Sequence, residues 1–356
     1  MSGHFGKTIL WWGRGDKHYS RNRIVLKLMA EFGYELDFFR PKISRLGSLQ
    51  ARFLNLTKPD LIWVPCFRHL DVKGASVFAK KWNIPLIFDP LISAYQKEIH
   101  ERKKWPENSF NARRRKKWET KIFSLPNRII CDTFVHADYF RQELLVPREK
   151  LRILFVGAEE DSFLILDKEK SYEKLPSVFH VLFYGSYLEL HGVDTIVKAA
   201  RLSRELPIQW TLVGEGSCFL EVKKMAKGLK NITFKKWLTY EELTKEIAQA
   251  DILLGVFGDT LLADMVIPNK VHQAMAAAKP LITCTAKAYQ GNIAGNPVIG
   301  WVPKADSLAL HNKLRDWISN YKDLKKRGKQ TRELYEQYFS KVKLVGMLEE
   351  ILETVN

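Results

Sequence analysis

Short apolar runs of strand length alternate along this chain with segments whose apolar residues recur at helical spacing. The first run, 7–13 (KTILWWG), precedes a helical pattern that Ser20 is placed to cap and Gly33 to end. The other strand-like runs of the first half are 36–40, 60–67, 85–89, 128–133 and 151–157. Strands that alternate with helices predict a mostly parallel, doubly wound sheet.

The alternation restarts after 161–176, a mixed-charge stretch without apolar periodicity that indicates a linker. Strand-like runs follow at 180–185, 208–214, 231–238 and 298–303, together with a strand–helix–strand unit at 251–284. Helical patterns cover 192–204, 240–250, 307–318 and 325–355. We therefore predict two Rossmann-like domains, 1–165 and 166–330, facing across a cleft. A C-terminal helix at 331–356 could pack back on the first domain.

The unit at 251–284 places two polar residues, Asn269 and Lys270, at the start of its helix. In an open α/β sheet, ligands lie where strand ends meet helix N-termini, and the helix dipole favours an anion there. Lys270 could therefore meet a phosphate as a point charge. An ordinary solvated lysine beside a helix cap is an equally good interpretation of this residue alone.

Composition narrows the class of partner. A net charge of +17 over 356 residues favours an anionic partner, either a nucleotide, a phospholipid surface or a nucleic acid. The four cysteines are widely spaced and form no CxxC pair, so we expect reduced, mostly buried thiols of a cytosolic protein. The sequence predicts no signal peptide, and no apolar stretch approaches the ~18 residues of a spanning helix.

The segment 100–123 combines nine Lys and Arg with three Glu and carries four interleaved aromatic residues, Trp105, Phe110, Trp118 and Phe123. A basic segment with exposed aromatics suits an anionic membrane surface. The same composition could bind RNA through charge and stacking, or could form a solvated helix face with a few core aromatics. We favour the membrane surface.

Polar residues follow several predicted strands of the first half. Asp89 and Ser93 come after one strand, and Asp132, Thr133 and His136 after the next. Such residues often only cap helices, but this edge of the sheet is also where these folds place chemistry. The turn Gly13-Arg14-Gly15-Asp16 follows the first strand without forming GxGxxG, so it is either a dinucleotide-type loop or a tight turn that lets backbone approach another surface.

The second half closely resembles the donor domain of glycosyltransferase family 4 enzymes, which have the GT-B fold. The motifs that carry the resemblance are Gly185-Ser-Tyr-Leu-Glu-Leu-His-Gly192, Leu212-Val-Gly-Glu-Gly216, Asn231-Ile-Thr-Phe-Lys-Lys-Trp-Leu238, Ala250-Asp251-Ile-Leu-Leu-Gly255 and the run from Ile267 to Ile282. The first half is similar to a subgroup of that family at 19–23, 88–93 and 131–140.

The resemblance implies transfer of a sugar from a UDP- or GDP-type donor to an acceptor hydroxyl, with retention of configuration, no metal and no other cofactor. It implies catalytic roles for Asp89, His191 and Lys270. It implies acceptor-side roles for Gly13, Arg14, Gly15 and Ser93. The donor-binding residues it implies are Gly185, Ser186, Gly192, Gly214, Glu215, Gly216, Trp237, Leu238, Asp259, Pro268, Asn269, His272 and Gln273.

The sequence departs from the family at the donor site. Ser186 and His191 stand where an Arg and a Lys usually hold the diphosphate, and Met265 and Gln273 stand where two glutamates usually contact the sugar and the ribose. We expect a lipid-linked or glycan acceptor of polysaccharide or glycolipid assembly, reached at the cytoplasmic face of the membrane through 100–123. A soluble-acceptor glycosyltransferase, and a catalytically weak nucleotide-binding scaffold, remain as alternatives. We expect no nucleic-acid partner.

Overall fold

The computed structural model describes residues 6–164 and 175–355, and their contacts divide the chain into two compact units. Unit 1 runs to Val156 and includes the chain from Leu344 on, whereas unit 2 spans Gly157–Lys343. The sequence placed the boundaries at 165 and 330. The segment 331–356, for which the sequence allowed packing on the first domain, is divided between the units: its last helix contributes to the core of unit 1, and the residues before Leu344 belong to unit 2.

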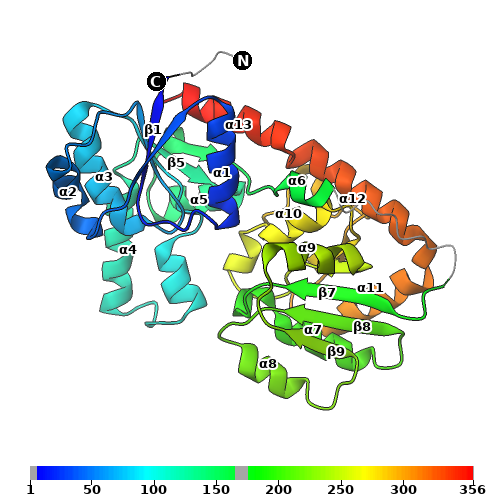
Figure 1. The fold of residues 1–356 in the computed structure, drawn as a ribbon. Helices are drawn as coiled ribbons and strands as arrows, with labels where there is room; N and C mark the ends of the chain where they lie inside the picture. The colour runs from blue at the N-terminus through cyan, green and yellow to red at the C-terminus, as the bar shows by residue number, and fades with distance from the viewer. Residues whose placement is uncertain (1–5, 165–174, 356) are drawn as a thin grey trace. The chain divides into compact units, whose positions relative to one another are not determined.

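Unit 1 is built on a six-stranded parallel sheet with the order β2-β1-β3-β4-β5-β6 (Figure 1). Its strands are β1 (Thr8–Trp12), β2 (Glu35–Phe39), β3 (Leu61–Val64), β4 (Leu86–Phe88), β5 (Arg128–Cys131) and β6 (Leu151–Ile153). Its α-helices are α1 (Ser20–Glu31), α2 (Gly47–Phe53), α3 (His69–Trp82), α4 (Phe110–Phe123), α5 (Phe134–Glu143) and α13 (Lys341–Glu353). Short helical turns are η1 (Ser44–Leu46), η2 (Gln96–Glu101) and η3 (Arg148–Lys150).

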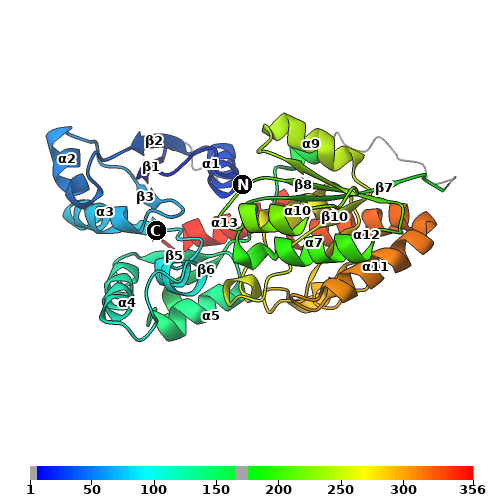
Figure 2. The same cartoon turned by 90° about the horizontal axis from the view of Figure 1, so that it is seen from below.

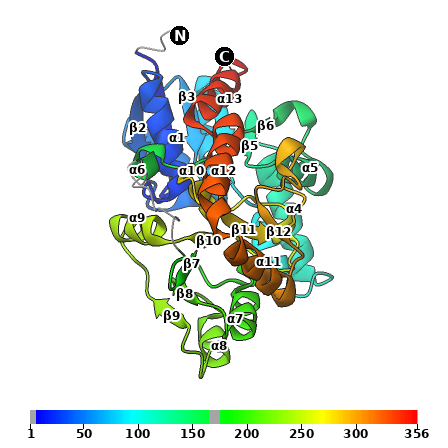
Figure 3. The same ribbon diagram turned by 90° about the vertical axis from the view of Figure 1, so that its right-hand side faces the viewer.

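The core of unit 1 joins the two ends of the chain. Leu28 of α1, Leu348 and Ile351 of α13, and Trp11 and Trp63 of the sheet belong to one buried cluster. α13 accordingly lies beside α1 although the whole chain separates them in sequence (Figures 1 and 3). α1 begins at Ser20 with Tyr19 in the cap position, so the predicted Ser20 cap is wrong by one residue.

Unit 2 is also built on a six-stranded parallel sheet, with the strand order β12-β11-β10-β7-β8-β9. Its strands are β7 (Phe179–Tyr184), β8 (Ile208–Val213), β9 (Ile232–Lys235), β10 (Ile252–Leu254), β11 (Leu281–Cys284) and β12 (Gly300–Val302). Its α-helices are α6 (Glu160–Leu164), α7 (Val193–Leu202), α8 (Phe219–Met225), α9 (Tyr240–Gln249), α10 (Asn269–Ala276), α11 (Ser307–Ser319) and α12 (Leu324–Tyr338). Short turns are η4 (Glu189–His191), η5 (Leu262–Asp264), η6 (Gly291–Ile293) and η7 (Tyr321–Asp323).

Helices pair on the sheet of unit 2, where α7 packs against α11 and α10 against α12 (Figure 2). The predicted linker 161–176 begins inside α6, and its residues 165–174 lie outside the described part of the chain. The two predicted parallel sheets are confirmed, and each strand falls within its predicted run or within one residue of it. In residues 6–164 and 175–355, no helix is long and apolar enough to cross a membrane.

Candidate functional site

The loops that follow β7, β8 and β10 touch one another through glycines. A Cβ on Gly214 would lie 2.2 Å from the carbonyl oxygen of Gly185, and one on Gly192 would lie 2.5 Å from the nitrogen of Gly258. Gly185, Gly192 and Gly214 also have φ of +144°, +60° and +116°, which side chains rarely adopt. Backbone therefore fills the space where side chains would stand, and three strand ends converge on one small region.

Lys270 is the charged group of this region. It is the second residue of α10, whose cap position is Pro268, and it is 5% exposed. Its ammonium lies 4.2 Å from the centre of the Phe183 ring, and a Cβ on Gly185 would approach its Nζ to 2.8 Å. Within the described residues, this Nζ has no hydrogen-bond acceptor. Burial consequently lowers the pKa of Lys270 well below its usual value.

His191 stands beside the same region. Its Nδ1 is hydrogen-bonded to the carbonyl oxygen of Ser186, so Nδ1 carries the proton and Nε2 is the acceptor of the neutral ring. Burial, together with the positive charge of Lys270, lowers the pKa of His191 to about 3. His191 is therefore neutral at physiological pH. It could donate a hydrogen bond from Nε2 to a phosphate only if the bound anion raised this pKa.

Gln273 lies one turn after Lys270 on the same helix and is 5% exposed. The hydroxyl of Tyr184, the last residue of β7, donates a hydrogen bond of 3.0 Å to Gln273 Oε1. The amide group is thereby oriented, with its NH₂ available for another acceptor. Met265, at the other departure from the family pattern, is buried and presents no polar atom.

The other predicted donor-binding residues occupy different surroundings. Trp237 is 56% exposed, and it and Leu238 follow β9. Asp259 is exposed after β10, with Lys304 3.9 Å away, although Lys304 is closer to Asp264 at 2.7 Å. Glu215 and Gly216 form the loop after β8 against Tyr187. His272 packs its ring on Phe339 at 4.5 Å, on a side of α10 that faces α12.

Unit 1 carries a buried ion pair behind its own strand ends. Arg21 of α1 donates from Nε to Asp89 Oδ2 at 2.9 Å, and from Nη1 to the carbonyl oxygens of Leu154 and Phe155 at 2.9 and 2.6 Å. Arg21 is 0% and Asp89 2% exposed. Burial raises the pKa of Asp89, which the charge and N–H groups of Arg21 oppose. One oxygen of the predicted catalytic carboxylate is thus engaged within the chain.

Ser93, predicted on the acceptor side, is fully buried. Its Oγ donates to Glu119 Oε2 at 2.8 Å and accepts from the N–H of Gln96 at 3.1 Å. Glu119 also lies 3.3 Å from His69, and these contacts lower the pKa of Glu119 against the effect of its burial. Ser93 therefore fastens the loop after β4 to α4.

The turn after β1 is held by backbone. Gly13 has φ of +135° and donates to the carbonyl oxygen of Phe39, while a Cβ on Gly15 would meet Pro65 at 2.8 Å. The guanidinium of Arg14 donates to the carbonyl oxygens of Pro41 and Lys42. The glycines are thus required by close approach, as the sequence suggested.

The polar residues after β5 form a separate arrangement. Thr133 accepts the N–H of His136 as the cap of α5, and His136 Nδ1 lies 2.5 Å from Asp132 Oδ1. His136 is fully buried and stacks on Phe140. Thr133 therefore has the capping role that the sequence allowed for it.

The basic segment 100–123 exposes its charges more than its aromatics. Among the four interleaved aromatics, only Phe110 is exposed, at 70%. Trp105 packs on the buried cluster around Tyr95, Trp118 stacks under Arg115 at 4.3 Å, and Phe123 is fully buried. The mixed interpretation, a solvated basic face with core aromatics, fits most of this segment.

Comparison with solved structures shows which known folds this architecture resembles. The structure superposes on HepE from Anabaena in complex with UDP, with a TM-score of 0.70, 13% identity and coverage of 98% of this chain and 100% of that one. Sucrose-phosphate synthase from Thermosynechococcus elongatus gives a TM-score of 0.72, 16% identity and coverage of 98% of both chains. The chain has the GT-B fold.

Sequence comparison gives matches mainly in the second half of the chain. Residues 178–320 match the profile of the family described as Glycosyl transferases group 1. Over 111 residues, the chain is 30% identical to an Escherichia coli protein named as a colanic acid biosynthesis glycosyl transferase, WcaI, which covers 31% of this chain. Over 233 residues, it is 24% identical to a Pseudomonas aeruginosa protein named as glycosyltransferase WbjE, which covers 62% of this chain. These matches span 27% and 56% of the two relatives' own lengths.

Three residues that contribute to this GT-B architecture were not singled out from the sequence. Arg21 lay within a noted motif, but nothing in its neighbourhood predicts burial, because its partners come from β4 and from the chain after β6. Phe183 and Tyr184, which contact Lys270 and Gln273, are the last two residues of the apolar strand β7. A polar hydroxyl at the end of an apolar strand was the available signal for Tyr184.

Proposed function

We propose that this protein transfers a sugar from a nucleotide diphosphate sugar to an acceptor hydroxyl. The observation that carries the proposal is the buried ammonium of Lys270 at the start of α10, which has no hydrogen-bond acceptor in residues 6–164 and 175–355 and lies inside the region that matches group 1 glycosyltransferases. A buried charge without a counterion is costly, and an anionic ligand would remove that cost. The diphosphate of the donor is an anion of the right kind.

In this proposal the diphosphate binds the Lys270 ammonium and the backbone at the N-terminus of α10, where the helix dipole favours an anion. Gly185 leaves room for the Lys270 ammonium beside its backbone, Gly214 lets its loop pack on Gly185, and Gln273 offers its NH₂ to a ribose hydroxyl. Trp237, Leu238 and Glu215 are proposed to contact the base, and Asp259 the sugar. We propose a UDP or GDP donor. HepE was solved with UDP and with UDP-glucose.

We further propose retention of configuration without a metal ion. Lys270 and the helix dipole would stabilise the negative charge that grows on the leaving diphosphate. A diphosphate oxygen would then accept the proton of the attacking hydroxyl on the same face of the sugar. The protein would need no nucleophile, in contrast to retaining hydrolases with two carboxylates.

We propose a lipid-linked or glycan acceptor of polysaccharide or glycolipid assembly, at the inner face of the cell membrane. The name of WcaI, a colanic acid biosynthesis glycosyl transferase, supports this class of product. The turn Gly13–Gly15 of unit 1 is proposed to receive the acceptor, since it follows the end of β1 and its Arg14 is exposed. The nine Lys and Arg of 100–123 would attract an anionic membrane mainly through charge.

The test is a thermal-shift screen against UDP, GDP, ADP and their sugar conjugates in the presence of EDTA, with Lys270→Ala beside the wild type. A ligand that binds only the folded state stabilises it by about 2.7 kcal/mol at a hundredfold excess over its dissociation constant. We expect a shift with one base that disappears in Lys270→Ala. Lys198→Ala, which removes an exposed lysine of α7, should keep the shift.

A second function is favoured by Ser186, Met265 and Gln273, which replace charged residues of the family pattern. A nucleotide-binding scaffold would show the thermal shift but would neither hydrolyse nor transfer the donor sugar. Release of the nucleoside diphosphate, measured with an acceptor extract, separates the two functions. No shift with any nucleotide would contradict both.

A further inference from the structure

The short helix α2 of unit 1 has its hydrophobic pattern reversed. Leu46, Leu49 and Phe53, spaced to share one helix face, are 44%, 51% and 85% exposed, whereas Gly47 and Ala51 face inward. Amphipathic helices of globular domains normally bury their large apolar residues. More of the exposed large apolar side chains fall in 38–82 than in any stretch of similar length among the described residues.

Close packing underneath enforces this reversal. A Cβ on Gly47 would lie 3.1 Å from the ring of Trp12, and one on Gly74 of α3 would lie 3.1 Å from the carbonyl oxygen of Ser44. α2 therefore rests on α3 and on the sheet through its smallest residues. The larger residues of α2 have no room on the inner side, and they face outward.

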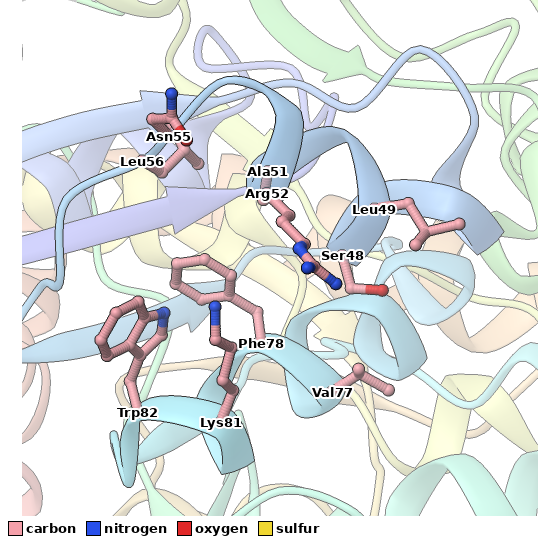
Figure 4. A pocket seen from close by; sticks show the side chains of 10 residues that line it. All are labelled: Ser48, Leu49, Ala51, Arg52, Asn55, Leu56, Val77, Phe78, Lys81 and Trp82. Atoms are coloured by element: carbon pink, nitrogen blue, oxygen red, sulfur yellow. The ribbon is translucent and has the colours of Figure 1, made fainter.

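A hollow of about 500 Å³ opens between the C-terminal parts of α2 and α3 (Figure 4). Ala51 and Phe78, both buried, form its inner wall, and the exposed residues Leu49, Val77 and Trp82 form its rim. Arg52 from α2 and Lys81 from α3 extend into the space between the helices (Figure 4). Apolar contact area and positive charge are thus interleaved on one surface, which we call the α2–α3 surface.

The net charge of this surface is positive. Residues 40–82 contain nine Lys or Arg and two Asp. Asp71 is fully buried against Arg68, and Asp60 accepts the backbone N–H of Thr8. Lys81 lies 4.6 Å from the centre of the Trp82 ring, so a cation and an amphipathic ring stand together at the rim. Basic residues next to exposed Leu, Phe and Trp are what an interfacial helix presents to anionic lipid.

We propose that the α2–α3 surface docks unit 1 on a bilayer that contains anionic phospholipid. Leu46, Leu49 and Phe53 enter the boundary between headgroups and acyl chains, and Arg52 and Lys81 bind headgroup phosphates. The segment 100–123 lacks the apolar part of such a site, since Phe110 alone of its aromatics is exposed. The inference extends the proposed lipid-linked acceptor by naming a docking site, but its test requires no glycosyl transfer.

The experiment is co-sedimentation of the full-length protein with vesicles of phosphatidylcholine, alone or mixed with phosphatidylglycerol. We expect binding to the mixed vesicles only, weakened by salt. The apolar pair Leu49→Ser with Phe53→Ser should weaken it by about tenfold. The charge pair Arg52→Gln with Lys81→Gln should weaken it on the order of 30-fold. The thermal unfolding of each variant reports whether the fold is intact.

Matched variants locate the binding surface. Leu220→Ser with Val342→Ser removes apolar residues that are 80% and 78% exposed in unit 2, and should leave binding unchanged. Arg113→Gln with Lys117→Gln, both exposed on α4, should weaken binding less than the α2–α3 charge pair. Loss with the α4 pair and none with the α2–α3 pairs would overturn the proposal.

Two further outcomes would also overturn it. A concentration-dependent dimer that Leu49→Ser with Phe53→Ser dissolves, without vesicle binding, would make the surface a contact between copies of this chain. Equal binding to neutral and anionic vesicles would remove the role of the charges. Because vesicle binding is read independently of UDP binding, failure of the proposed glycosyl transfer would not be mistaken for failure of docking.

Discussion

Both units are built on a six-stranded parallel sheet, but their buried cations have different surroundings. In unit 1, Arg21 lies behind the strand ends with Asp89 as its counterion and two backbone carbonyls as further acceptors. In unit 2, Lys270 is equally hidden, yet its ammonium faces the ring of Phe183 and has no acceptor among the described residues. Among the described residues, Arg21 has a carboxylate counterion, with only its Nη2 lacking a partner, whereas the ammonium of Lys270 has no hydrogen-bond acceptor at all.

This difference supports the proposal that the ligand binds at the strand ends of unit 2, where Lys270 lies. The ion pair of unit 1 holds three segments together, and the charge of Asp89 already compensates that of Arg21. A lysine that is desolvated and unpaired gains a full charge-assisted contact when an anion arrives. The pair in unit 1 is therefore structural, and in the proposed function the charge in unit 2 binds the ligand.

The largest expected effect follows from breaking the pair in unit 1. Asp89→Ala leaves Arg21 buried without a counterion, so we expect a loss of about 3–5 kcal/mol in the free energy of unfolding. Urea denaturation measures it. The double variant Arg21→Met with Asp89→Leu, which removes both charges, should recover most of the loss. Unchanged stability with abolished transfer would instead assign Asp89 the catalytic role that the family resemblance implies.

In unit 2, we expect a substitution of the buried cation to increase the free energy of unfolding. Lys270→Met removes an unsatisfied buried group and should raise the free energy of unfolding by about 1–3 kcal/mol. The same change removes a charged hydrogen bond to the diphosphate and should weaken UDP binding by roughly 100-fold. Unfolding curves and isothermal titration calorimetry measure the two effects. A variant that binds UDP as well as the wild type would contradict the comparison.

Gly185 links the glycine loops to Lys270 and gives a smaller effect. In Gly185→Ala, the new methyl group would lie 2.8 Å from Nζ, and the backbone would keep a φ of +144° that side chains disfavour. We expect about tenfold weaker UDP binding and a stability loss of about 1–3 kcal/mol.

Gly228→Ala is the matched control for this change, because φ there is +83° and no atom lies within 4 Å of the added Cβ. Gly228→Ala should lower the stability through backbone strain but should leave the UDP affinity unchanged. Equal affinity losses in both variants would mean that strain, not the contact with Lys270, weakens binding.

The fold could be predicted because its signals are local. Apolar runs ended by glycine or by a polar residue mark the strands, and α10 begins at Asn269, within the three residues 268–270 at which the sequence predicts the helix to open. The positions of Lys270 at a helix start and of Gly185 and Gly214 at strand ends followed from the same patterns, whereas Gln273 was singled out only by the family resemblance.

The partners of the site residues could not be predicted, because they come from distant segments. Arg21 meets Asp89 68 residues later and Leu154 133 residues later. Ser93, predicted to face the acceptor, is engaged by Glu119 of α4. The outward face of α2 also escaped prediction, because an apolar residue at helical spacing is ordinarily expected to be buried, and only the glycine contacts beneath α2 reverse that expectation.

The pH dependence of nucleotide binding is the finest test of the comparison. Burial lowers the pKa of Lys270 in the free protein, and a bound diphosphate would raise it again. Binding then takes up a proton between these two pKa values, so UDP affinity should fall as pH rises through that window, by up to about tenfold per pH unit. Above pH 7 the phosphate, whose second pKa is about 6, contributes little to the change in affinity.

Calorimetry from pH 7 to 9, in buffers of different ionisation enthalpy, measures the proton uptake directly. The paired Arg21 offers no such proton, and Lys270→Met should abolish the uptake. A pH-independent affinity in the wild type would mean that Lys270 gains nothing from the ligand.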